Sequence, residues 1–328
     1  MDNMQKIPVF FTFDANYLLA AKVAIHSMMK HASRQYWYEL YVFHTTLSPK
    51  AQQSLRNSLK EFTHTELHFI DVTQYNEKIK NFGTKAHYSK EIFYKLIATD
   101  VLPQYDRIIC SDVDVVFTGD FSPVFFMFPN EKFYYGVGPV ENSRMPYYRK
   151  DFSTTEMEIL EHEIAAGFLL INLKELRNDH KQEEIINFYV NNYPRLRLPE
   201  QDCIILTCWP YIKYLPIDYS LPISFYRLNM NQRDFYQGNT EFAGDKATAL
   251  AKFNKGLAHP VQIHYAGFDK PWNCFRLTRR QDWIKAMKST PGGMVLYLKS
   301  LPRNLLMRTK RYSLKRFLRK TYKRITNR

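Results

Sequence analysis

The chain has 328 residues, of which 45% are hydrophobic and 24% charged; this composition excludes a disordered or collagen-like protein, and the length fits one large domain or two modest ones. The net charge of +14 comes from the C-terminal end, because fourteen Lys and Arg residues and no acidic residue follow Asp282, whereas the chain up to Asp282 has 32 residues of each sign. This division argues against a body that binds nucleic acid and favours a basic tail that meets an anionic surface.

The N-terminal part of the chain alternates the patterns of strands and helices. Short apolar runs predict strands, and longer runs predict helices, one of which has Ser48 as its cap and Pro49 at its first position. Such alternation indicates an α/β fold with a mostly parallel sheet, in which ligands bind at the carboxyl ends of the strands. The predicted strands are 7–13, 36–45, 65–72 and 106–117, and the predicted helices are 16–32, 48–62 and 91–102.

The middle of the chain is less regular. Predicted strands at 132–140 and 165–173 flank a polar, tyrosine-rich segment whose length is typical of a functional lid or a mobile loop. Helical patterns dominate from about 180 to 208, a second polar segment covers 229–246, and a late strand is predicted at 261–265. The run Pro291–Gly293 predicts a hinge before the basic tail.

The cysteines and the apolar runs indicate in which cellular compartment the protein is expected. The four cysteines, at positions 110, 203, 208 and 274, form no CxxC pair, which favours buried, reduced thiols. The N-terminus lacks the features of a signal peptide, and Lys22 and His26 interrupt the longest apolar run. We therefore expect a cytoplasmic protein that does not span a membrane.

The acidic pair Asp112-Val113-Asp114 follows an apolar run within the predicted strand 106–117. Residues i and i+2 of a strand face the same way, so the two carboxylates can bind one hard cation together with phosphate oxygens. Two acids on a buried strand are costly unless something neutralises them. The alternative is a pair of solvated turn acids with no ligand.

A second polar group follows the late strand. His264 can be a third metal ligand, Gly267 lets the backbone approach a phosphate closely, and Lys270 can neutralise a diphosphate. The alternative is a structural histidine.

A third group lies where the first strand turns into a helix, in the run Thr12-Phe13-Asp14-Ala15-Asn16-Tyr17. Asp14 and Asn16 can cap that helix and do nothing more. The same geometry suits a nucleoside, with Asp14 on the base edge and Tyr17 stacked on the ring. Both interpretations remain open from the residues alone.

Taken in order, the runs FFTFDANY, SDVD, AAGFLLINLKELR, EQD and HYAGFDKPW resemble glycosyltransferase family 8 over about residues 7–275. This family contains retaining enzymes, among them bacterial lipopolysaccharide and lipooligosaccharide galactosyl- and glucosyltransferases and the glycogenins. The resemblance implies a GT-A fold, a Rossmann-like mixed sheet flanked by helices, that binds a UDP-sugar with Mn²⁺ or Mg²⁺.

The resemblance also assigns roles to residues. It places the metal on the acidic pair and His264, the uridine on the N-terminal group, and the diphosphate on Gly267 and Lys270. Glu200 and Gln201 fall beside the anomeric carbon and form, with Lys270, the expected catalytic set. The implied metal ligands are Asp112, Asp114 and His264, and the implied donor-binding residues are Thr12, Asp14, Asn16, Tyr17, Lys95, Asp112, Val113, Ala165, Gly267 and Lys270.

Two positions depart from the family pattern. Ala165 stands where the family commonly has an asparagine that touches the donor sugar, and Lys95 replaces an arginine that reaches the donor. A lysine is a point charge and an arginine a bidentate fork, so the exchange is not neutral. Both departures alter the sugar pocket and leave the metal and diphosphate residues intact.

The mechanism follows from where charge develops. Negative charge builds on the β-phosphate as UDP leaves, and a metal ion with Lys270 can stabilise it without an acid. No strong carboxylate nucleophile is evident beyond Glu200 and Asp202, which favours attack by the acceptor hydroxyl on the same face, with retention.

The basic tail has its own pattern. From Arg303 on, apolar residues such as Leu314 and Leu318 recur at helical spacing with Lys and Arg mostly on the other side, which predicts a basic amphipathic helix on an anionic membrane surface. The alternatives are a solvated helix packed on the body and an RNA-binding arm. We expect a catalytic domain over 1–280 and a helical attachment segment over 281–328.

The sequence therefore predicts a metal-dependent retaining hexosyltransferase that moves galactose or glucose from a UDP-sugar to a bacterial surface glycan, such as lipopolysaccharide, with a lipid-linked acceptor at the inner face of the cytoplasmic membrane. A non-catalytic basic protein that binds RNA or membrane is the rival from another class. A degenerate family member that binds UDP-sugar without transfer is the third hypothesis.

Overall fold

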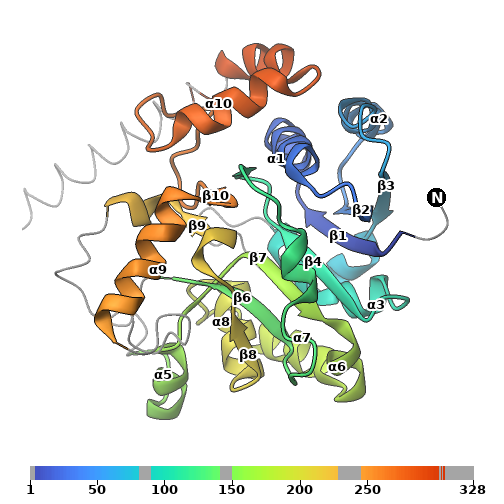
Figure 1. Cartoon of the computed structure of the whole chain (residues 1–328). Coiled ribbons are helices and arrows are strands. Elements are labelled where there is room, and N and C mark those ends of the chain that lie inside the picture. The colour runs from blue at the N-terminus through green and yellow to red at the C-terminus, as the bar shows by residue number, and fades with distance from the viewer. Residues whose placement is uncertain are drawn as a thin grey trace, which may run out of the picture.

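Two sheets organise the chain in the computed structural model, which describes residues 4–80, 90–140, 150–227, 245–302, 304 and 306 (Figure 1). The larger sheet has seven strands in the order β3-β2-β1-β4-β7-β6-β8, and the smaller has three in the order β5-β10-β9. Helices cover the larger sheet on both sides, as the predicted α/β class requires.

The N-terminal half of the larger sheet is parallel, as predicted. Its central strands are buried on both faces, which explains why their sequences are continuous apolar runs rather than alternating ones. Each pairs in parallel with its neighbour. The strands are β1 (Lys6–Thr12), β2 (Trp37–His44), β3 (Thr65–Asp71) and β4 (Arg107–Ser111).

The other half makes the sheet mixed, as the resemblance to the family implied. Strand β7 (Ile164–Asn172) runs antiparallel to both β4 and β6 (Tyr135–Pro139), and β8 (Ile212–Tyr214) is parallel to β6. All nine residues of β7 are buried, because it lies in the middle of the sheet.

The predicted strand 106–117 is two strands in two sheets. Strand β4 ends at Ser111, and β5 (Val115–Phe117) pairs antiparallel with β10 (Gln262–His264), which also pairs in parallel with β9 (Leu221–Pro222). The chain thus crosses from one sheet to the other in the three residues that contain the acidic pair. A turn, and not strand alternation, therefore sets the direction of the two carboxylates.

The helices confirm most of the predicted pattern. Ser48 accepts a hydrogen bond from Ala51 N and caps the second predicted helix, as expected. The predicted helix 91–102 is instead a 3-10 helix that is followed by one short α-helix. The α-helices are α1 (Leu18–His31), α2 (Pro49–Ser58), α3 (Ala98–Val101), α5 (Thr154–Leu160), α6 (Leu173–Asn178), α7 (Lys181–Asn192), α8 (Pro199–Cys208), α9 (Lys246–Ala258) and α10 (Arg280–Ser289), and the 3-10 helices are η1 (Ala15–Tyr17), η2 (Thr73–Ile79), η3 (Lys90–Ile97), η4 (Ser122–Phe126), η5 (Ile217–Tyr219) and η6 (Ile223–Arg227).

The two long polar segments are only partly described. Residues 141–149 and 228–244 lie outside the described ranges. The remainder of the first segment contains α5, whose cap Ser153 and third residue Glu156 form a reciprocal capping box, so this part is ordered helix rather than loop. The four cysteines are buried and unpaired, as predicted.

The C-terminal part of the described chain packs on the body. Helix α10 lies beside α1 (Figure 1) and also contacts β5, and its Trp283 is fully buried. The predicted hinge is a tight turn, because Gly292 has a φ of 72° and a Cβ on Gly293 would lie 2.4 Å from Met287 O. After it the chain is helical over 293–302, where Tyr297 is buried, so core packing continues past residue 280.

The basic tail from 307 on, with its predicted amphipathic helix, lies outside the described residues. In the ranges that are described, no helix has the length and apolar character needed to cross a bilayer.

Candidate active site

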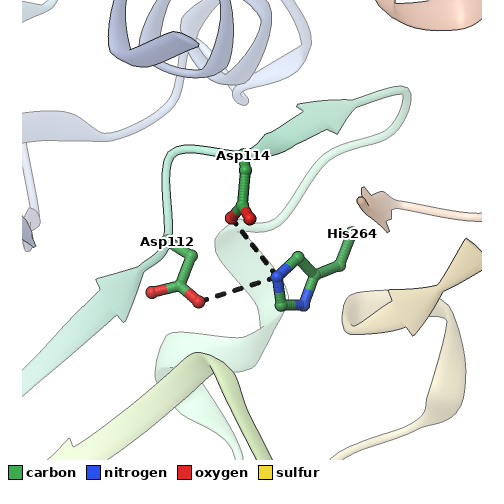
Figure 2. A group of neighbouring side chains, drawn as sticks. All are labelled: Asp112, Asp114 and His264. Carbon is green, nitrogen blue, oxygen red and sulfur yellow. Dashed lines mark ion pairs between the residues drawn. The ribbon is translucent and has the colours of Figure 1, made fainter. Parts of the chain in front are cut away.

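The acidic pair and the predicted histidine converge where the two sheets meet. Asp112 follows β4, Asp114 precedes β5, and His264 ends β10 opposite Val115. His264 Nε2 lies 3.3 Å from Asp114 Oδ1 and 3.6 Å from Asp112 Oδ2 (Figure 2). The pairing of β5 with β10 therefore brings together residues that are about 150 positions apart.

These three side chains fit a divalent cation. One ligand atom from each lies within 4.8 Å of the other two, and among the described residues theirs is the one group of this kind. Carboxylate oxygens suit Mg²⁺ and Mn²⁺, and the imidazole nitrogen adds a donor that transition metals accept. The donor set thus matches the predicted Mn²⁺ or Mg²⁺ site.

Lys270 is buried on the Asp114 side of the acidic pair, which we call the outer side. Its ammonium donates to Asp114 Oδ2 and, over 2.9 Å, to Tyr265 O. Burial acts to raise the pKa of Asp114, but the charges of Lys270 and His264 hold it well below its usual range. An ammonium has three donors, so two are used within the described structure and one remains for a ligand.

Lys95 lies on the inner side and is almost completely buried. Its Nζ is 3.0 Å from Ala166 O, 2.6 Å from Asp112 Oδ1 and 3.5 Å from Glu200 Oε1. Burial acts to lower the pKa of Lys95, yet the carboxylates of Asp112 and Glu200 raise it above its ordinary value. All three donors of this ammonium thus face protein oxygens.

Glu200 is the acid of this inner group. It stands in the first turn of α8 and is buried, and burial raises its pKa although Lys95 opposes the shift. Its Oε2 has no hydrogen-bond partner among the described residues. The neighbouring Gln201 donates through Nε2 to Ile164 O, beside Ala165 on β7.

Gly167 on β7 supports the ring of His264. A Cβ at this position would lie 2.4 Å from His264 Nδ1, closer than real Cβ contacts come. The buried Nδ1 has no hydrogen-bond partner in the described structure, so packing against the glycine holds this side of the ring while Nε2 faces the two carboxylates. Sequence reasoning gave Gly167 no role, although it stands in the quoted AAG run.

The predicted nucleoside group is assembled at the start of η1. Asp14 accepts from Asn16 N at 2.8 Å and from Tyr17 N at 3.2 Å, which confirms Asp14 as the cap, whereas Asn16 lies within the helix; uridine binding stays a prediction. The hydroxyl of Thr12 donates to Glu91 O. Burial, followed by the charge of Asp114, raises the pKa of Tyr17, so this phenol lies near the acidic pair.

The other residues predicted to bind the UDP-sugar differ in how closely a ligand can approach them. Gly267 has a φ of 89° and open space where a Cβ would be, so its backbone can be approached closely. Val113 is a buried core residue, so only its main chain can face a ligand. Trp272, to which sequence reasoning gave no role, contacts the ring of Tyr17 with centroids 5.8 Å apart.

Comparison with known proteins is consistent with this geometry. Residues 8–275 match the model of the family described as "Glycosyl transferase family 8". A curated relative, the lipopolysaccharide 1,2-glucosyltransferase of Escherichia coli, is 20% identical over 93% of this chain and 84% of its own length.

Solved structures show the same fold. The galactosyltransferase LgtC, solved with donor and acceptor sugar analogs, is 18% identical, with a TM-score of 0.66 over 87% of this chain and 96% of its own. The bifunctional glycosyltransferase WbbM, in its apo form, is 23% identical, with a TM-score of 0.69 over 89% of this chain. The chain spans about half of WbbM, 51% of its length. The architecture is therefore an α/β fold with a mixed sheet, like that of LgtC.

Proposed function

The chain belongs to glycosyl transferase family 8, and we propose that it transfers a hexose, galactose or glucose, from a UDP-sugar to a bacterial surface glycan, with a divalent metal and retention of the anomeric configuration. The observation that carries this proposal is the convergence of Asp112, Asp114 and His264 beside a lysine with one donor to spare.

The diphosphate half of the reaction uses the outer side of the site. Asp112, Asp114 and His264 would hold Mn²⁺ or Mg²⁺, which when bound supplies positive charge to the diphosphate oxygens. Lys270 directs its remaining proton to the β-phosphate, where negative charge grows as the bond to the sugar lengthens. Departure of UDP is the step that these groups assist.

The sugar half uses the inner side. Glu200 Oε1 is paired with Lys95, and Asp202 Oδ2 accepts hydrogen bonds from the backbone of Arg197 and Leu198. Glu200 Oε2 has no hydrogen-bond partner among the described residues but is buried, as is Asp202, so neither carboxylate is exposed to attack a bound sugar. This arrangement supports attack by the acceptor hydroxyl on the face that UDP leaves, which retains configuration without a covalent intermediate.

The names of the relatives and the charge of the tail support a lipid-linked glycan as the acceptor. One relative is called a lipopolysaccharide glucosyltransferase, and LgtC is a galactosyltransferase. A tail with eleven Lys and Arg residues from Arg303 on favours attachment to an anionic membrane surface. We propose a lipid-linked glycan acceptor at the inner face of the cytoplasmic membrane.

Donor hydrolysis and transfer test the proposal. We expect the chain to hydrolyse UDP-glucose or UDP-galactose slowly in the presence of Mn²⁺, to stop when the metal is chelated, and to release a sugar of retained configuration. UDP binding without hydrolysis or transfer would indicate a member that only binds its donor. The absence of metal-dependent UDP binding would contradict the assignment of the site.

A further inference from the structure

Two buried hydrogen bonds link the two sheets directly behind the acidic pair. Gln262, the first residue of β10, is completely buried and donates through Nε2 to Ser111 Oγ over 3.0 Å. Ser111, the last residue of β4, in turn donates through Oγ to the main-chain oxygen of Asp112 over 2.8 Å. These two hydrogen bonds in series, which we call the Gln262 relay, therefore end on a proposed metal ligand.

The relay lies on the same face of β10 as His264. Side chains at positions i and i+2 of a strand face the same way, so Gln262 and His264 share one face of this three-residue strand. Their contacts place that face against β4 and β7, because the amide of Gln262 reaches Ser111 and the ring of His264 packs on Gly167. The strand thus presents one proposed ligand and also the group that holds the main chain of another.

The turn between β4 and β5 is held at both ends by its main chain. Asp112 N donates to Gly167 O over 2.9 Å, and Asp114 O accepts from Tyr265 N over the same distance. The peptide group that follows Asp112 is held by the hydroxyl of Ser111. Rotation of that peptide would swing Asp114 relative to Asp112, so the relay fixes the distance at which the two carboxylates face one cation.

The relay costs stability, which argues that it serves the site. Gln262 Oε1 is buried and has no hydrogen-bond partner among the described residues. A buried acceptor without a partner destabilises the folded state, and an apolar side chain of similar size would avoid this cost. The hydrogen-bond partners behind metal ligands set the geometry of those ligands and hence the affinity for the metal. A polar side chain at this position is therefore explained by the site in front of it.

We propose that Gln262 and Ser111 are positioning residues, which hold the main chain of Asp112 in the geometry in which Asp112 and Asp114 bind one divalent cation. Both act through Asp112 and not by contact with the donor. The inference rests on the proposed function for the identity of the site. It requires a loss of metal affinity that is separate from any loss of stability.

The test measures the affinity for Mn²⁺ in the full chain. The variants are Ser111→Ala, which removes the hydroxyl, Gln262→Leu, which replaces the amide by an apolar group of similar size, and the two combined. The control is Ser220→Ala, because Ser220 is also completely buried but its hydroxyl has no hydrogen-bond partner among the described residues. Electron paramagnetic resonance of free Mn²⁺ in the presence of UDP gives the affinity, and urea denaturation gives the stability.

We expect Ser111→Ala and Gln262→Leu each to weaken Mn²⁺ binding about tenfold or more, while Ser220→Ala binds as wild type does. The double variant should bind no more weakly than Ser111→Ala, because the two residues act in series on one carbonyl. Gln262→Leu should keep the stability of wild type, because it also removes the unpartnered Oε1. A tenfold loss of affinity in a chain of normal stability is a result that a purely structural contact cannot produce.

The opposite results are equally distinct. Wild-type affinity for Mn²⁺ in both single variants, whatever their stability, overturns the inference and makes the relay a contact of the fold alone. Losses that add in the double variant overturn the arrangement in series. Failure of the wild-type chain to bind Mn²⁺ with UDP contradicts the proposed function itself, and this inference falls with it.

Discussion

Two lysines flank the acidic pair from opposite sides, and their surroundings differ. Lys95, on the inner side, is buried with all three donors on Ala166 O, Asp112 and Glu200. Lys270, on the outer side, uses two donors, on Asp114 and Tyr265 O, and stands in the segment that contains the open backbone of Gly267. Within the described residues, the protein occupies all three donors of Lys95 and two of the three donors of Lys270.

This difference separates positioning from binding. A saturated, buried ammonium fixes the carboxylates around it and has nothing left for a ligand. An ammonium with a spare donor beside an accessible backbone can meet a diphosphate. The resemblance to the family implied that Lys95 reaches the donor, whereas its contacts favour an indirect role through Asp112 and Glu200.

The largest effect should come from removing the inner lysine. We expect Lys95→Met to lower the free energy of unfolding by about 3–5 kcal/mol, because Glu200 would remain buried, and Asp112 partly buried, without their partner. Urea denaturation measures this. Lys22→Met is the matched control, since Lys22 is equally buried but, within the described residues, pairs only with the hydroxyl of Ser54, and burial lowers its pKa.

The pH dependence of Lys95→Met sharpens the same test. Burial already raises the pKa of Glu200, and loss of Lys95 should raise it further. A carboxyl whose pKa is higher in the folded than in the unfolded protein binds its proton more tightly when folded, so its contribution to stability falls as pH rises above the unfolded value. The free energy of unfolding that Lys95→Met loses relative to wild type should therefore be smaller at pH 5 than at pH 8. A deficit independent of pH would contradict a buried charge as its cause.

The next largest effect concerns the metal ligands. We expect Asp114→Asn and His264→Ala each to lower the rate of transfer by about 10²–10³-fold at saturating Mn²⁺, because each removes a ligand of the proposed cation. Steady-state transfer from the UDP-sugar measures this, with Asp179→Asn, an exposed acid remote from the acidic pair, as the control. Near wild-type turnover in either variant would remove that residue from the ligand set.

Removal of the outer lysine should affect rate more than affinity. We expect Lys270→Ala to lower kcat by about 100-fold while the Kd for UDP rises less than tenfold, because the charge that Lys270 meets grows as the bond to the sugar breaks. Turnover and UDP titration measure the two quantities. Equal losses in kcat and in UDP affinity would instead show that Lys270 binds the diphosphate equally well before and during bond breaking.

The fold and the site also differ in how well they could be predicted from the sequence. The alternating patterns predicted β1, β2, β3 and the cap at Ser48, and left the cap at Asp14 open, because these features depend on local chemistry. The resemblance placed Asp112, Asp114 and His264 together, and the contact between them depends on the pairing of β5 with β10. The break of the predicted strand after Ser111 was not predictable, because apolar residues continue on both sides of it while the sheet changes.

The inner group was the least predictable part. Lys95, Ala166 and Glu200 come from three elements, and nothing in their local patterns indicates that they meet. The resemblance named Lys95 and Glu200 as separate donor contacts, whereas the structure pairs them with each other. Long-range packing of η3, β7 and α8, which no local periodicity records, decides this contact.

The smallest effect we predict tests whether Gly167, which follows Ala166 on β7, positions His264, the third proposed metal ligand. Gly167 stands next to Ala166, whose carbonyl binds Lys95, and the ring of His264 rests on it. We expect Gly167→Ala to weaken Mn²⁺ binding in the presence of UDP by about 10–100-fold, because the added methyl must push the imidazole away from the carboxylates. Free Mn²⁺ measured by electron paramagnetic resonance reports this affinity without reference to turnover.

The control for Gly167→Ala is Gly136→Ala on the neighbouring strand β6, where the added methyl would lie 3.2 Å from the side chains of Leu170 and Leu215 and would not meet His264. Both variants strain the same sheet, so both should lose some stability, but only the first should lose affinity for the metal. Equal Mn²⁺ affinities in the two variants would show that the His264 ring moves aside without cost, and the positioning role would then belong to the Lys95 group alone.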